Sequence, residues 1–254
     1  MLTNIAPEVL SAFKGVWRIY LSGRCSQPAC IDAILTRFTE LRYAHVDNVS
    51  CAGQVCPPPQ FMAQPAGLRL GASFRWDFNP HWRSLTVLAL DAVHLGVLKH
   101  AGAFVQAVGP QLVTFSLECV WDSYAVGLWR QIGRINVRHM PKLENLHLRI
   151  PESAPYKHGW AYRVLGQHDD NVPMGPIPAS LREITISLHL TNSRHLADVC
   201  RDWSGTHEYW SAPQITIKFI HVAGLPFDDA EQAIRASFGR LYFPRQLEVI
   251  NPSP

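Results

Sequence analysis

The sequence predicts an α/β fold in which short strands and helical segments alternate around a parallel sheet. The first observation is the segment LVTFSL at 112–117, which has the form L-x-x-L-x-L. Its inner apolar residues, Phe115 and Leu117, are two positions apart, as in a strand with one buried face. The second observation is that the phrase returns as LENLHL at 143–148, after a helix-like run that starts at Asp122. Strands joined in this way stack as a parallel sheet with helices on its other side, because such crossovers are right-handed.

The same phrase recurs along most of the chain. Hexamers begin at residues 16, 38, 65, 85, 112, 143 and 181, and an imperfect eighth lies near 212. Their spacing runs from 20 residues, between 65 and 85, to 38 residues, between 143 and 181, whereas leucine-rich repeats typically take about 20–29. We therefore expect one irregular leucine-rich-repeat solenoid over residues 1–254, with a parallel concave sheet and helices on the convex side. The alternative is an ordinary α/β domain whose strands share leucines.

The remaining elements are predicted from the segments between hexamers. Helices are expected at 6–14, 30–37, 95–108 and 194–203, and a strand at 215–222. A final helix has Asp228 as its expected N-cap, with Glu231 three residues on, and a strand at 247–250 closes the chain. A Pro/Gly-rich insertion interrupts the pattern at 151–180. No hexamer carries the asparagine that ladders many leucine-rich repeats, so the units should be irregular.

Composition and charge reduce the number of function classes that are expected. The net charge is +3, and acidic and basic residues are interspersed, whereas nucleic-acid-binding domains usually carry a basic stripe. We expect no nucleic-acid partner. No window approaches 18 uninterrupted apolar residues and the first residues do not resemble a signal peptide, so neither a membrane partner nor secretion is expected. Six cysteines in 254 residues do not form a dense disulfide framework. These features favour a cytoplasmic or nuclear protein.

The residues between the leucines are expected to line the concave sheet, since neighbouring strand residues point to opposite faces. The two rows would be the fifth hexamer positions (Tyr20, Arg42, Arg69, Ala89, Ser116, His147, Thr185) and the third (Arg18, Glu40, Gly67, Val87, Thr114, Asn145, Glu183). The end that opens the sheet is basic and aromatic, and Trp, Tyr and Arg are enriched at binding hot spots. The expected partner-binding residues are Trp17, Arg18, Tyr20, Arg42, Arg69 and His147. The alternative is that this end packs against a missing N-terminal segment.

The cysteines offer a second hypothesis. Cys25 and Cys30 form a C-x4-C pair, and Cys51 and Cys56 form another, within the loose spacing of tetrahedral zinc sites. The alternative reading is four buried or idle thiols, and our primary expectation is no metal and no cofactor. No H-E-x-x-H, G-x-S-x-G, P-loop or G-x-G-x-x-G motif occurs. We therefore expect a non-catalytic protein, with a metal-stabilised or enzymatic α/β domain as the alternative.

Several longer runs resemble a known family. They are LTVLALDAVHL (85–95), FVQAVGPQLVTFSLECVWDS (104–123), LENLHLRI (143–150), LREITISLHLTN (181–192) and AEQAIRASFGRLYFPRQLEVI (230–250). Together they resemble the leucine-rich portion of F-box-like proteins of basidiomycete fungi. The resemblance covers roughly residues 85 to 250 and implies a leucine-rich solenoid that presents substrates to an SCF-type ubiquitin ligase.

The resemblance does not extend to the F-box itself. The opening helix leads straight into the strand-like VWRIYL at 16–21, which leaves no room for that helical segment. We therefore expect the ubiquitin-ligase adaptor as a partner only if an F-box is supplied elsewhere. The expected function is protein–protein recognition, similar to the substrate-binding half of an F-box receptor. A decayed product without a partner is a third reading.

Overall fold

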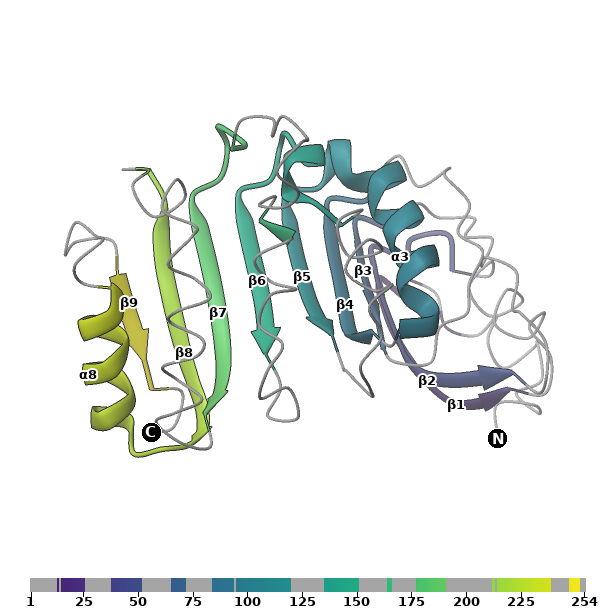
Figure 1. The fold of residues 1–254 in the computed structure, drawn as a ribbon. Coiled ribbons are helices and arrows are strands. Elements are labelled where there is room, and N and C mark those ends of the chain that lie inside the picture. The colour runs from purple at the N-terminus through teal and green to yellow at the C-terminus, as the bar shows by residue number, and fades with distance from the viewer. Residues whose placement is uncertain are drawn as a thin grey trace.

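A computed structural model describes residues 13, 15–25, 38–51, 65–71, 84–93, 95–119, 135–150, 164–165, 177–190, 212, 214–238 and 247–251. Nine strands in these ranges form one sheet in which all neighbours are parallel and the spatial order equals the chain order (Figure 1). The strands are β1 (Arg18–Cys25), β2 (Tyr43–Cys51), β3 (Gly67–Leu70), β4 (Val87–Val93), β5 (Thr114–Cys119), β6 (Asn145–Ile150), β7 (Glu183–Leu190), β8 (Thr216–Gly224) and β9 (Leu247–Ile250). The prediction of an α/β fold with a parallel sheet is confirmed.

Successive units are joined by a recurring pair of backbone hydrogen bonds at the start of each strand. The second residue of a hexamer presents its carbonyl to the next unit, where in most units two successive N–H groups donate to it. Glu144 and Asn145 donate to the Val113 carbonyl at 2.9 and 3.1 Å. Arg182 and Glu183 donate to the Glu144 carbonyl at 2.9 and 3.0 Å. This backbone ladder aligns the units without the asparagine that the hexamers lack.

A tight turn stands before several of the strands. The first hexamer residue donates its N–H to the carbonyl three residues earlier, as Leu143 does to Met140 and Leu181 to Pro178, both at 3.0 Å. Met140 and Pro178 are buried. The repeating unit therefore contains a fourth inward-facing position, which lies before the hexamer.

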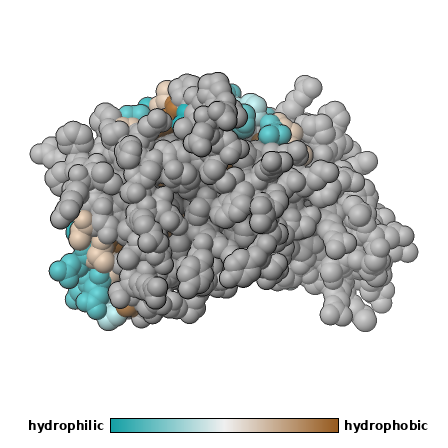
Figure 2. Space-filling model, viewed as in Figure 1, coloured by the Kyte–Doolittle hydropathy of each residue, from teal (hydrophilic) through white to brown (hydrophobic). Residues whose placement is uncertain are grey.

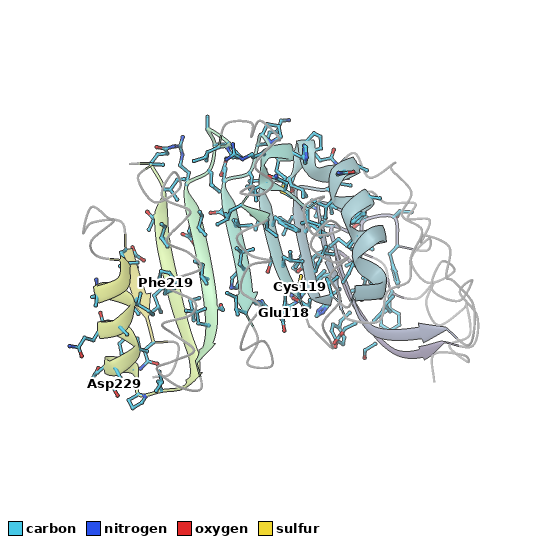
Figure 3. All side chains as sticks on the ribbon, viewed as in Figure 1. Glu118, Cys119, Phe219 and Asp229 are labelled. Atoms are coloured by element: carbon cyan, nitrogen blue, oxygen red, sulfur yellow. The ribbon has the colours of Figure 1, made fainter. Side chains whose placement is uncertain are left out.

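The apolar core lies on one face of the sheet. Along β5, Phe115 and Leu117 are fully buried while Thr114 is partly exposed, as expected for side chains that alternate between two faces. The neighbours Glu118 and Cys119 continue this alternation, with Cys119 in the core (Figure 3). Helix α3 (Leu95–Val108) adds its own buried residues to the same core: Ala101, Phe104, Val105 and Val108.

The two ordered α-helices in the described ranges match their predictions closely. Helix α3 has the predicted bounds. Helix α8 (Phe227–Phe238) begins two residues earlier than an N-cap at Asp228 implies, so Asp228 lies with Asp229 in its first turn rather than at the N-cap. Carboxylates there interact favourably with the helix dipole. In the view of Figure 2, the α8 end of the molecule presents mainly hydrophilic residues. No helix in the described part of the chain is both long and apolar enough to cross a membrane.

Two short 3-10 helices complete the described elements. One, η2 (Gly109–Gln111), follows α3 directly. The other, η3 (Val137–His139), lies in the described end of the helix-like run predicted from Asp122, and Asn136 Oδ1 accepts the Arg138 N–H at 2.9 Å at its start. The helices predicted at 30–37 and 194–203 lie outside the described residues, as does all of the helix predicted at 6–14 except Phe13.

The predicted frame of the second unit is wrong. The hexamer was expected at 38–43, but β2 begins at Tyr43 and pairs Tyr43 with Gly67. The true hexamer is LRYAHV at 41–46, in which Leu41, Ala44 and Val46 are buried. Phe38 is buried as the turn residue before it, and Leu41 donates its N–H to the Phe38 carbonyl. Because Phe38 and Leu41 are three apart, they imitate the start of a hexamer.

Candidate recognition surface

The face of the sheet opposite the core carries polar side chains in rows. The register aligns the third-position row as Arg18, Tyr43, Gly67, Val87, Thr114, Asn145, Glu183 and Thr216, and the fifth-position row as Tyr20, His45, Arg69, Ala89, Ser116, His147, Thr185, Lys218 and Glu248. Tyr43 and His45 therefore occupy the places predicted for Glu40 and Arg42. All other predicted members of both rows are in register. We call this surface the polar face.

The first strand and the residues just before it expose large apolar side chains. Phe13, Trp17 and Tyr20 are each 59% exposed, and they are the large hydrophobic residues that the described part of the chain leaves open to solvent. An open depression of about 610 Å³ lies at the same end, lined among the described residues by Gly15, Trp17, Glu40 and Arg42. Exposed apolar groups beside a concave surface are typical of interaction sites.

Contacts with aromatic rings hold Arg18 and Tyr20 in place at this end of the polar face. The Arg18 guanidinium lies 5.0 Å from the centroid of the Tyr43 ring, a cation–π contact. The ring also lies over Gly67, because a Cβ at that glycine would come within 2.7 Å of Tyr43 Cε2. Tyr20 meets the His45 ring edge to face at 4.6 Å. The cation of Arg18 is thus held in a defined position rather than extended freely into solvent.

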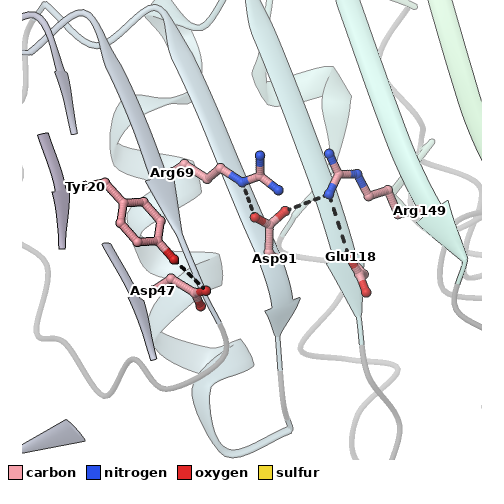
Figure 4. A network of polar contacts seen from close by, with 6 residues as sticks. All are labelled: Tyr20, Asp47, Arg69, Asp91, Glu118 and Arg149. Carbon is pink, nitrogen blue, oxygen red and sulfur yellow. Dashed lines mark hydrogen bonds and ion pairs between the residues drawn. The ribbon is translucent and has the colours of Figure 1, made fainter. Parts of the chain in front are cut away.

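A network of ion pairs occupies the middle of the polar face (Figure 4). Asp91 accepts a hydrogen bond from Arg69 Nε and lies 3.3 Å from Arg149 Nη1. Arg149 Nη1 also lies 3.9 Å from Glu118 Oε2. The register between β4 and β5 shifts after Leu90, so that β4 carries one extra residue beside Asp91. Such bulges redirect a side chain, and here two arginines from different strands share one carboxylate.

The neighbouring part of the polar face contains a histidine–serine pair. His147 Nε2 and Ser187 Oγ share a hydrogen bond of 2.7 Å. Burial, and then the charge of Arg149, lowers the pKa of His147 to about 4. A nucleophile activated by histidine needs a base poised near neutral pH and a third group to orient it. With this pKa, His147 is a weak base at neutral pH. Among the described residues, Ser187 is the one hydrogen-bond partner of its ring.

The last strands end the polar face with a second ion-pair cluster. Lys218 Nζ lies 2.7 Å from Glu183 Oε2 and 3.8 Å from Glu248 Oε2. Thr185 Oγ1 donates to Glu183 Oε1 at 2.9 Å. Although burial alone would raise the pKa of Glu183, the hydrogen bonds from Lys218 and Thr185 lower it. The one cation of this cluster is therefore shared by two carboxylates.

The structure divides the six predicted partner-binding residues into two groups. Trp17 and Arg42 line the depression, with Arg18 and Tyr20 on the adjacent strand β1. Arg69 and His147 lie farther along the polar face. Arg69 is paired with Asp91 and His147 with Ser187, so these two belong to networks within the chain.

Sequence reasoning missed several members of these networks. Asp91, Glu118 and Arg149 lie one position beyond the hexamers, on the part of each strand that the phrase does not include. Tyr43 was missed because the second unit was misaligned. Continuing the alternation two residues past each hexamer would have found Glu118 and Arg149. It would equally have found Asp91, which follows its hexamer at the same position, although not the bulge beside it.

The described residues include only part of the predicted cysteine site. Cys25 and Cys51 are register partners at the ends of β1 and β2. Cys30 and Cys56 lie outside the described residues. Cys119, by contrast, is a free cysteine in the core, where burial raises the pKa of its thiol. Within the described ranges no group of three potential ligands stands close enough together to hold a metal.

Three comparisons with known proteins returned nothing: no family model, no curated protein and no solved structure matches this chain. Function is therefore inferred from the surface itself.

Proposed function

We propose that the chain is an irregular leucine-rich-repeat solenoid whose function is non-catalytic protein–protein recognition. Two observations support the leucine-rich-repeat assignment: the nine parallel strands follow one another in chain order, and the backbone ladder repeats between units. In repeat proteins of this kind each unit contacts only its neighbours, which creates an extended surface for binding. The polar face and its β1 end supply such a surface here.

One observation carries the proposal. The three large apolar side chains that the described residues expose lie within eight positions of the chain, and one of them, Trp17, lines the open depression. Exposing them costs free energy unless another surface covers them. Two of the three are Trp17 and Tyr20, residue types that dominate binding hot spots. The recognition surface should therefore centre on β1 and not on the neutralised middle of the polar face.

The test is affinity capture from cell extract with three baits. The first bait is the unchanged chain and the second carries Trp17→Ala, Tyr20→Ala and Arg42→Ala. The third is a matched control with Lys142→Ala, Glu144→Ala and Arg182→Ala, which are exposed residues on the units of β6 and β7. We expect proteins captured by the unchanged chain and the control bait but lost with the second bait. If the second bait captures the same proteins at the same yield, the β1 end is not the recognition surface.

The resemblance to F-box-like proteins leads to a narrower proposal, that the chain acts as the substrate-binding half of a ubiquitin-ligase receptor. Support comes from the same repeat architecture. The ligase adaptor should then be captured only when an F-box is supplied, for example by fusing one to the N-terminus. Fusion without recovery of the adaptor, in a chain that circular dichroism shows to be folded, would remove the ubiquitin link and leave the recognition proposal intact.

A metal-stabilised domain is the second candidate, and one observation favours it. Cys25 and Cys51 are register partners on adjacent parallel strands, and neighbouring strands lie only about 4.8 Å apart. Elemental analysis of purified protein tests this candidate. A stoichiometric zinc content that falls in a Cys25→Ser, Cys51→Ser variant would establish it, and protein without metal that melts at the same temperature with and without chelator would remove it.

A further inference from the structure

We infer that the outer edge of β1 binds an extended, acidic segment of a partner protein by adding it to the sheet as a further strand. The inference rests on the proposed recognition function and specifies the partner of the same surface. It depends on three properties of this edge as the described residues form it: backbone groups that no described strand pairs, arginines that no described carboxylate pairs, and exposed aromatic side chains.

The backbone of β1 offers an open edge. It is the first strand in the sheet order, and in the described part of the chain no strand pairs with its outer side. The Trp17 carbonyl faces β2, where it accepts the N–H groups of Arg42 and Tyr43 at 2.8 and 3.0 Å. Because backbone groups alternate in direction along a strand, those of Arg18 and Tyr20 face outward. Free N–H and C=O groups of this kind are a template for strand addition.

The charges at this edge select the partner. Arg18 and Arg42 are both exposed and neither forms an ion pair with a described carboxylate, whereas Arg69 and Arg149 share Asp91. Arg18 is held in place by the Tyr43 ring. Glu40 also lines the depression, but its Oε2 lies toward Gly15, 3.8 Å from the position of a Cβ there. Two fixed or exposed cations beside free backbone groups favour a segment with carboxylates at alternate positions.

Exposed aromatic groups supply the apolar part of the same site. Trp17 lines the depression just before β1, and Tyr20 lies on the polar face of β1. An added strand would place alternate side chains toward Tyr20 and Arg18, since residues two apart share a face. A partner segment of alternating acidic and β-branched residues therefore fits both the charge and the backbone of this edge.

A second copy of this chain fits the edge less well. Pairing of two β1 strands would bring together two copies of a segment that contains two arginines. Like charges placed directly opposite each other destabilise a strand pair. The described residues of β1 include no carboxylate to offset this repulsion. The sequence of β1 thus disfavours self-association and favours an acidic partner.

The probe for the test is a fluorescent, end-blocked hexapeptide of alternating Glu and Val, titrated with the full chain and followed by anisotropy. Three further ligands are a Lys–Val hexapeptide, a Glu–Val hexapeptide with alternate amides N-methylated, and an oligothymidine of twelve nucleotides. We expect the unmodified Glu–Val peptide to bind and the other three ligands not to bind. Added salt should weaken this binding, because the site is exposed. Arg18→Gln and Arg42→Gln should each weaken it about tenfold, as expected for the loss of a charge-assisted hydrogen bond. Arg182→Gln, an exposed arginine at the position of Arg42 in a distant unit, should leave it unchanged.

Other outcomes overturn the inference. Equal binding of the Lys–Val or the N-methylated peptide would show that charge or strand addition is not involved, and no binding of the Glu–Val peptide would remove the site. Binding of the oligonucleotide alone would assign the arginines and aromatics to nucleic acid. Concentration-dependent dimers in sedimentation that Arg18→Gln strengthens would assign the edge to a second copy. If affinity capture succeeds while the Glu–Val peptide fails, the recognition function stands and only this partner class is wrong.

Discussion

Gly67 in β3 makes room for the ring of Tyr43, which in turn carries the guanidinium of Arg18. A methyl group at Gly67 would come within 2.7 Å of Tyr43 Cε2, so the ring would have to move. We expect Gly67→Ala to lower the free energy of unfolding by about 1–3 kcal/mol, the usual range for overpacking. The measurement is urea denaturation.

A second variant identifies the cause of that loss. If the Tyr43 ring is what the new methyl group meets, Gly67→Ala should cost much less in a Tyr43→Ala background, a coupling that a double-mutant cycle measures. Additive losses would mean that the glycine is needed for another reason.

His147 gives the polar face a predictable dependence on pH. Burial, followed by the charge of Arg149, lowers its pKa to about 4 from an ordinary value of 6.5. Between these pH values the unfolded chain binds a proton that the folded chain does not, so the free energy of unfolding falls as the pH is lowered through this window and levels off below it. Asp91, Glu183 and Arg69 act on the same ring with opposing signs.

The His147→Gln variant tests that dependence. Its stability should differ most from that of the unchanged chain near pH 7, and the difference should shrink as urea denaturation is repeated toward pH 4. In this variant the dependence of the unfolding free energy on pH should not vanish entirely, because burial, and then the charge of Arg69, also lowers the pKa of His45. Thr114→Ala, which removes no titratable group, is the control and should leave the slope as it is. A slope unchanged by His147→Gln would contradict the assignment.

At the scale of the element, the alternation of buried and exposed residues along each strand decides what a substitution costs. Phe115 is fully buried in β5, and its neighbour Thr114 is half-buried on the polar face. We expect Phe115→Ala to cost about 3–5 kcal/mol of unfolding free energy and Thr114→Ala less than about 0.5 kcal/mol. Thermal or urea denaturation of both variants checks this, and comparable losses would mean that the two faces are assigned wrongly.

This alternation also explains which elements could be predicted. The period-two pattern identified the strands of seven units because their leucines face one core, and α3 and β9 have their predicted bounds. It failed at the second unit, where Ala44 takes the place of a leucine and Phe38 in the preceding turn imitates the pattern. Periodicity does not reveal where a strand inserts an extra residue. The bulge after Leu90, which lies next to Asp91 in the central network, was therefore not predicted.

At the scale of the whole molecule, each inner strand is paired on both sides and the end strands on one. Strands β5, β6 and β7 lie in the interior of the sheet, whereas β1 and β9 lie at its ends. We expect amide hydrogen exchange, measured by mass spectrometry, to be slowest in β5–β7 and to quicken toward both ends, because local opening needs fewer bonds to break there. Uniform protection along the sheet would indicate that the units open together. Binding of a strand to β1 should slow exchange in β1 first.

The ladder of shared carbonyls has a mechanical consequence. Since the strands follow one another across the sheet in chain order, a pull on residues 18 and 250 acts across the strands and not along them. The load then falls on one inter-strand ladder at a time, and each unit can detach before the next is strained. Stretched in an optical trap, the chain should lengthen in a series of small, low-force steps, like a zipper drawn open from one end, and not in one abrupt rupture.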